Sequence, residues 1–69
     1  MTRATYDINR LADDMAAKGW LAADLARKAG VSKMTVSRVL NSDSQSARTM
    51  AKLAEALGYT VRRYLRRVA

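Results

Sequence analysis

Apolar residues recur along this chain at helical spacing, and a glycine follows the first, second and fourth of the apolar stripes. The first stripe occupies the i, i+3, i+4, i+7 and i+8 positions of one helix face, with Ile8, Leu11, Ala12, Met15 and Ala16. Thr5 stands at the N-cap position before this stripe, and Gly19 stands just after it. The pattern predicts a first helix from about Tyr6 to Lys18.

Four more helices are expected at about residues 22–29, 32–40, 46–57 and 60–68. Their apolar positions are Leu25, Ala26, Ala29, Val36, Val39, Leu40, Met50, Leu53, Ala54, Leu57, Val61, Tyr64, Leu65 and Val68. Ser32, Ser46 and Thr60 are good N-cap residues, whereas Leu21 offers no capping group to the second helix. The expected fold is all-α, with five helices packed as one compact domain over residues 1–69.

Residues 21–40 carry a more specific pattern, in which a short helix, a glycine turn and a second helix follow one another. Ala26 is small where two helices must approach closely. Gly30, four residues later, permits the positive φ of a tight helix-ending turn, and Val36 returns to the core from the second helix. This is the helix-turn-helix arrangement, whose second helix can lie in the major groove of DNA.

The charge of the chain points to a polyanionic partner. It has 13 Lys and Arg residues against 6 Asp and Glu residues, a net charge of +7. No acid occurs between residues 31 and 42, which include the second helix of the motif. No acid follows Glu55 either, and the last stretch contains Arg62, Arg63, Arg66 and Arg67. The C-terminal arginines fit either a contact surface or a merely solvated end.

Several function classes are excluded by residues that the chain lacks. Without cysteine or histidine it has no disulfide, no thiolate metal site and no neutral-pH acid/base, so we expect neither metal nor cofactor. Asp13 and Asp14 are adjacent and therefore splayed apart on a helix, which argues against an enzyme. The apolar runs are far shorter than the roughly 20 residues of a membrane span, and the first residues lack a signal-peptide pattern, so we expect a cytoplasmic protein.

The chain resembles the lambda-repressor-like family of phage Cro and CI repressors, the XRE-type helix-turn-helix domain. The resemblance covers residues 8–65 and rests on Leu25-Ala-Arg-Lys-Ala-Gly30, Val31-Ser-Lys-Met-Thr-Val36 and Leu53-Ala-Glu-Ala-Leu-Gly58. Residues 30–41 are also similar to the recognition segment of LacI-type repressors. Those proteins use a different following helix and a large sugar-binding domain, which 69 residues are too few to contain.

The resemblance implies that the start of the second motif helix reads base edges, through Lys33, Met34 and Arg38 with Ser37 beside them. An arginine can donate two parallel hydrogen bonds to guanine O6 and N7, worth about 1–3 kcal/mol of discrimination. Lys33 can donate to guanine or hold a phosphate. Met34 fits either a thymine methyl contact or an ordinary position at the surface or core edge.

Phosphate contacts are expected near the starts of the second and fourth helices, because helix N-termini present unpaired N–H groups. The candidates are Thr35, Ser46, Arg48 and Thr49, with Arg10 and Arg27 as further candidates. At the start of the second helix many relatives carry a phosphate-clamping Gln, whereas this chain has Ala22. A contact there would rest on backbone amides alone.

The leading hypothesis is a sequence-specific regulator of transcription, a Cro-like repressor that binds double-stranded DNA as a homodimer on a two-fold-symmetric operator. The alternative is an antitoxin that neutralises a toxin protein and autoregulates its operon, because similar folds serve both roles. Residues 61–69 also form a short basic amphipathic stretch, but nine residues bury too little for a membrane anchor. The fifth helix, with Tyr64 and Val68, is the expected dimer interface, although its arginines would repel across a two-fold axis.

Overall fold

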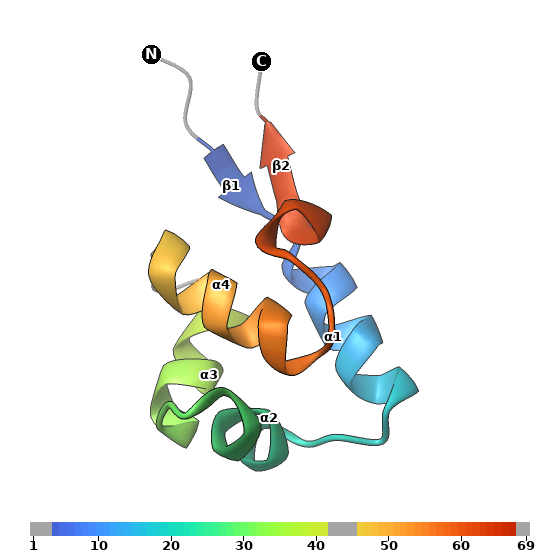
Figure 1. The fold of residues 1–69 in the computed structure, drawn as a ribbon, viewed down its shortest axis with the longest axis vertical. Helices are drawn as coiled ribbons and strands as arrows, with labels where there is room; N and C mark the ends of the chain where they lie inside the picture. The colour runs from blue at the N-terminus through green and yellow to red at the C-terminus, as the bar shows by residue number, and fades with distance from the viewer. Residues whose placement is uncertain (1–3, 42–45, 68–69) are drawn as a thin grey trace.

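The computed structural model describes residues 4–41 and 46–67. Within them lie four α-helices, one 3₁₀ turn and two short strands (Figure 1). Their order is β1 (Ala4–Tyr6), α1 (Ile8–Ala17), α2 (Ala22–Ala29), α3 (Lys33–Leu40), α4 (Ala47–Ala56), η1 (Val61–Tyr64) and β2 (Leu65–Arg67). The two strands stand together at one end of the molecule, and α2 and α3 form the other end. No helix of the described ranges is long and apolar enough to span a membrane.

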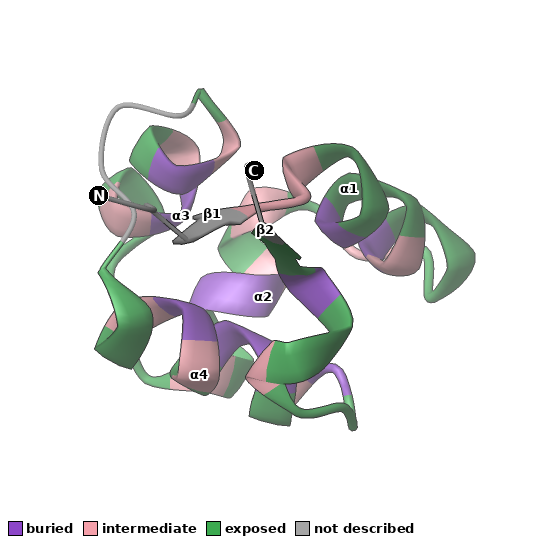
Figure 2. Ribbon diagram, turned by 90° about the horizontal axis from the view of Figure 1, so that it is seen from above, coloured by how far each residue is buried: buried purple, intermediate pink, exposed green. Residues whose placement is uncertain are grey.

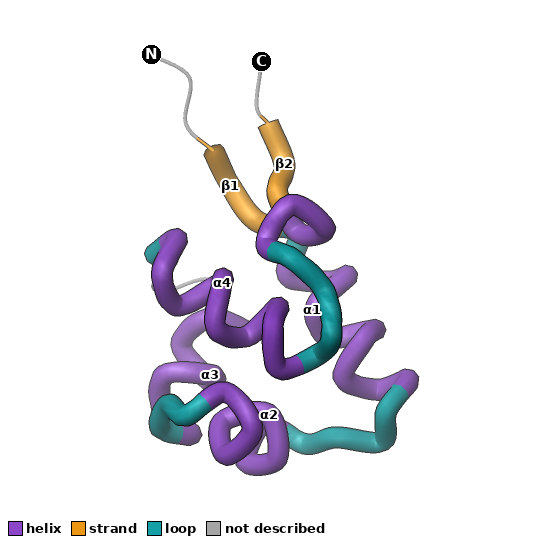
Figure 3. Tube along the Cα trace, in the orientation of Figure 1, coloured by secondary structure: helices purple, strands orange, loops and turns teal. Residues whose placement is uncertain are grey.

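The predicted helix-turn-helix is confirmed as α2 and α3, joined by the short turn that Figure 3 shows. Gly30 ends α2 with φ 73°, in the left-handed region that favours glycine, and the Val31 N–H donates to the Ala26 carbonyl at 3.0 Å. The Ser32 hydroxyl accepts the Thr35 N–H at 3.1 Å and so begins α3 as expected. The turn therefore sets the angle at which α3 leaves α2.

One apolar core joins all four helices and η1. The buried residues, coloured purple in Figure 2, are Leu11, Met15, Leu25, Ala26, Val36, Val39, Met50, Leu53, Ala54, Leu57 and Tyr64. Trp20, which precedes α2, is half-buried against this core. Because α2 and α1 pack against one face of α3, the residues of its opposite face are exposed.

The first helix is shorter than predicted. Asp7, rather than Thr5, is its N-cap, and its carboxylate accepts the Arg10 N–H at 3.0 Å. Tyr6 belongs to β1 instead of to the helix, and Ala12 and Ala16 are exposed although they fit the apolar stripe. An Asp is the stronger cap, and residues 4–6 gain a strand partner that local sequence does not reveal.

The all-α fold class is confirmed by the four helices, but the prediction of a fifth helix is wrong. The expected fifth helix is only the 3₁₀ turn η1, after which β2 pairs antiparallel with β1, Tyr6 opposite Leu65 and Thr5 opposite Arg66. Thr60 precedes η1 but makes no capping hydrogen bond with its side chain. The hydrogen bonds between β1 and β2, which lie far apart in the sequence, satisfy the backbone N–H and C=O groups that a longer helix would have satisfied locally. Val68, expected in that helix, lies outside the described residues.

A polar clasp, consisting of Asp14, Arg63 and Tyr64, fastens this end to α1. Both oxygens of Asp14 accept from Arg63, at 2.7 Å from Nε and 2.9 Å from Nη2, and the Tyr64 hydroxyl donates to Asp14 at 2.6 Å. These bonds, those of Arg63 above all, lower the pKa of Asp14. Burial, together with the bond to Asp14, raises the pKa of the Tyr64 hydroxyl. Tyr64, expected at a dimer interface, is therefore an interior residue.

Candidate nucleic-acid interface

The exposed face of α3 carries the four residues expected to read bases. Lys33, Met34 and Arg38 are exposed and Ser37 is half-buried, while Val36 and Val39 hold the other face in the core. Met34 is 65% exposed although it is a large apolar side chain. The alternative of a Met34 at the core edge is therefore wrong, and its side chain is available to a partner.

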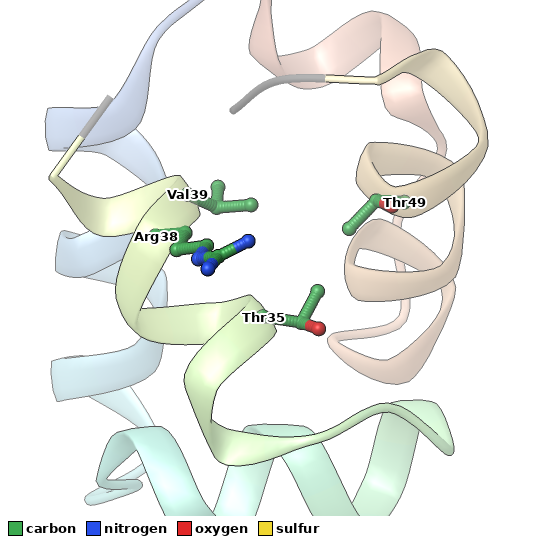
Figure 4. Close-up of a pocket in the computed structure, with 4 residues that line it drawn as sticks. All are labelled: Thr35, Arg38, Val39 and Thr49. Atoms are coloured by element: carbon green, nitrogen blue, oxygen red, sulfur yellow. The ribbon is translucent and has the colours of Figure 1, made fainter. Parts of the chain in front are cut away.

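A polar pocket separates α3 from the start of α4. Its volume is about 190 Å³, and Thr35, Arg38, Val39 and Thr49 line it. Figure 4 shows the Arg38 side chain extending from α3 into the space that Thr35 and Thr49 border. Two of the expected phosphate residues and one expected base reader thus meet at one site, although Arg38 and Thr49 come from different helices.

The helices on both sides of this pocket begin with the same Ser-x-x-Thr arrangement. The Ser46 hydroxyl accepts the Thr49 N–H at 3.1 Å and donates to Thr49 Oγ1 at 2.8 Å. In α3 the hydroxyl oxygens of Ser32 and Thr35 lie 2.9 Å apart. Because Thr49 Oγ1 receives a hydrogen from Ser46, its own hydroxyl hydrogen stays available to an anionic oxygen.

The electrostatics of this face favour an anion. Lys33, Arg38 and Arg48 are all exposed, and no carboxylate of residues 4–41 or 46–67 forms an ion pair with them. The α4 amides of Ala47 and Arg48 also lack a hydrogen-bond partner within those ranges. Free cations and unpaired amides on adjacent elements suit the phosphates of a nucleic-acid backbone.

Three further phosphate candidates lie in less favourable surroundings. Arg27 donates to Asp24 at 3.0 Å on its own helix, and Arg10 Nε lies 4.0 Å from Asp7 on the first turn of α1. Ala22, at the start of α2, is half-buried and lies two residues before Asp24. None of these three lines the pocket between α3 and α4.

Two features of this region were missed from the sequence. Val39, expected only as a core residue, also forms part of the pocket wall. The Asp24 carboxylate accepts the Leu21 N–H at 2.8 Å. It therefore gives a hydrogen-bond partner to this backbone donor at the start of α2. This bond lowers the pKa of Asp24, as does the ion pair with Arg27. An acid three residues after the N-cap position is the signal that could have revealed it.

Two helices joined by a turn that contains a glycine, with the second helix basic and exposed, have the geometry of a DNA-binding domain. The family model described as bacterial regulatory proteins, lacI family, matches residues 23–60, just over half of the chain. The chain belongs to this family. Comparison with curated proteins and with solved structures found no match to either.

The LacI-family match extends beyond the segment that first suggested it. The similarity to the recognition segment of LacI-type repressors covers residues 30–41. The family model also spans most of α2, all of α4 and the following turn. The protein is therefore a helix-turn-helix DNA-binding regulator of transcription. The pocket between α3 and α4 lies wholly inside the matched region.

Proposed function

We propose that this LacI-family domain is a sequence-specific repressor that binds an operator in the major groove of double-stranded DNA. The observation that carries the proposal is the set of exposed cations on α3 and at the start of α4, Lys33, Arg38 and Arg48. There Arg38 shares a pocket with Thr35 and Thr49, and no described acid pairs with the cations. A DNA-binding role also places the protein with the nucleoid in the cytoplasm.

Base reading falls to the exposed residues of α3. Arg38 donates to guanine O6 and N7, the commonest specific contact of an arginine with DNA. Lys33, at the start of α3, reaches a guanine or the adjacent phosphate. Met34 packs on a thymine methyl, and Ser37 lies beside Arg38 as a short donor or acceptor.

The edges of the same surface hold the DNA backbone. Thr35, Ser46, Arg48 and Thr49 flank the pocket or begin α4, so phosphates that pass along this edge meet hydroxyls, a guanidinium and free amides. Arg10, Arg27 and the amide of Ala22 are secondary contacts, because two of them already face acids and the third lies near Asp24.

Binding as a homodimer follows from the small size of the reading surface. One α3 offers only four candidate base contacts, whereas two copies about one helical turn apart add their binding free energies. Repression is then steric, as in Cro-like proteins, because the dimer covers promoter DNA. The antitoxin alternative would be favoured by an exposed apolar surface near the end of the chain. Of the two described apolar residues there, Tyr64 is fully buried and Leu65 is 37% exposed.

Selection from a random pool of duplex DNA with the full 69-residue chain, at near-physiological salt, tests the proposal. The expected result is enrichment of an inverted repeat whose half-site contains a guanine opposite Arg38. Enrichment of a single half-site would contradict the homodimer. If binding were weak, salt-sensitive and equal for all sequences, the repressor proposal would fail and a protein partner would have to be sought.

A further inference from the structure

The most exposed large apolar side chain of the described residues is Leu21, at the N-cap position of α2. It is 74% exposed, more than Met34 at 65% and twice as much as Leu65 at 37%. The other helices begin with Asp7, Ser32 and Ser46, each of which accepts a backbone N–H of its own helix. The Leu21 side chain makes no such bond. A serine at this position would stabilise the start of α2 better.

The surroundings of Leu21 are unsuited to a phosphate. The carboxylate of Asp24 already accepts the Leu21 N–H at 2.8 Å and would repel a second anion. Arg27, on the same helix, is paired with that same carboxylate at 3.0 Å. The start of α2 therefore differs from the start of α4, where a hydroxyl, a free guanidinium and free amides are all present.

Leu21 belongs to the same helix-turn-helix as the exposed residues of α3, because it lies directly before the first residue of α2. In a helix-turn-helix the first helix crosses the DNA backbone while the second enters the groove. Docking of this kind brings the start of α2 to the DNA backbone. An exposed leucine at that place can bury its side chain only against the apolar parts of DNA, the deoxyribose carbons and the thymine methyl.

We infer that Leu21 is an apolar DNA-contact residue that packs on deoxyribose or thymine methyl carbons when the domain binds its site. This inference rests on the proposed function and adds a contact outside the recognition helix. Stability and binding then make opposite demands at this position: a capping residue would stabilise α2, while the leucine strengthens the complex with DNA.

Substitution by a capping residue separates the two demands. Leu21→Ser completes a Ser-x-x-Asp box with Asp24, so we expect the Tm to rise by about 4 °C. Loss of the leucine side chain that the complex buries against DNA should weaken binding to the selected operator about fivefold to tenfold. Leu21→Met, which keeps an apolar side chain, should bind like the wild type. Leu65→Ser, which removes an exposed leucine at the far end of the molecule (Figure 1), should not change DNA affinity.

The salt dependence distinguishes an apolar contact from an ionic one. Affinity measured by fluorescence anisotropy at several salt concentrations should give the same slope of log K against log salt for Leu21→Ser and the wild type. Operators with uracil in place of single thymines identify the contacted carbons. A thymine methyl contact weakens the wild type at one position and leaves Leu21→Ser unaffected there. A deoxyribose contact leaves every uracil operator as tight as its parent.

Two results would overturn the inference while leaving the proposed function in place. One is a Leu21→Ser variant that binds the operator as tightly as the wild type. The other is a loss of affinity accompanied by a shallower salt slope, which would assign the effect to phosphate contacts near Asp24. A wild-type chain without any sequence preference would instead overturn the proposed function, and this contact with it.

Discussion

The two ends of this protein use arginine in different ways. At the helix-turn-helix end, Arg38 and Arg48 are exposed and unpaired with any described carboxylate. At the strand end, Arg63 donates two hydrogen bonds to Asp14 and lies over the Tyr59 ring, 4.1 Å from its centroid. Net charge counts these residues alike, but only the first group has its hydrogen-bond donors available to DNA. The comparison teaches that the surroundings of an arginine in the fold, more than its charge, decide whether it stabilises the fold or stays available to a ligand.

The largest effect is expected at the strand end, where Tyr64 is fully buried and belongs to the clasp. Tyr64→Ala leaves a cavity and removes the hydrogen bond from the Tyr64 hydroxyl to Asp14, which should cost about 3–5 kcal/mol of the free energy of unfolding. For a domain of this size that is much of the total stability, so the variant should be largely unfolded in a thermal melt followed by circular dichroism. Tyr59→Ala, at an exposed tyrosine, is the control and should melt only slightly below the wild type.

At the other end, Arg38→Ala should leave folding intact and remove the preference for one base pair. Losing the paired donors to guanine should cost about 1–3 kcal/mol on the selected operator, while affinity for random DNA changes little. Competition binding with operator and random duplexes measures both quantities. Arg62→Ala is the matched control, because it removes an exposed arginine from the strand end. Equal losses on both duplexes would move Arg38 from the base readers to the phosphate contacts.

A smaller effect, spread over all sequences, is expected for Arg48→Ala at the start of α4. Removing one phosphate contact should weaken binding about fivefold at near-physiological salt and reduce the salt slope by about one. Titrations of operator and random DNA over a range of salt concentrations measure the change. An unchanged slope would show that Arg48 does not contact a phosphate, and the comparison between the two ends would then rest on Arg38.

The smallest effect concerns Asp14, whose partner Arg63 is partly exposed, with 35% of its side chain accessible. Asp14→Asn should destabilise the fold by about 1 kcal/mol at neutral pH, because solvent weakens the ion pair. The pKa of Asp14 is lowered in the fold, so its stabilisation is present above pH 3.8 and is lost as the pH falls through the lowered value. Urea unfolding from pH 7 to pH 2 should bring the two proteins together at the acid end. A constant difference would contradict a charged clasp.

Much of the helix-turn-helix could be predicted because its signals are local. Gly30 must adopt a positive φ, Ser32 and Ser46 begin helices with their own hydroxyls, and apolar residues such as Leu25 and Val36 recur at helical spacing. Each signal acts over a few residues. The boundaries of α2 and α3 therefore agree with the prediction, and the family match lies over them.

The strand pair and the clasp could not be predicted in the same way. Asp14 and Arg63 are far apart in the sequence, and on a helical pattern Asp14 is simply one of two adjacent surface acids. The stretch from Val61 onward has a helical pattern too, yet it forms a 3₁₀ turn and a strand because β1 supplies hydrogen-bond partners. The pocket of Thr35, Arg38 and Thr49 likewise required the packing of α4 against α2 and η1.

By itself, the sequence determined the presence of α1 to α4, the turn between α2 and α3, and the basic, acid-free character of the recognition helix. Backbone conformation, capping and side-chain periodicity depend on neighbours within a turn or two. Only the tertiary structure decided which cations are paired, which hydroxyls face one another across the pocket, and that Leu21 is exposed at the start of α2. Those properties depend on contacts between residues distant in sequence and on the solvent that packing excludes, and no local pattern encodes either.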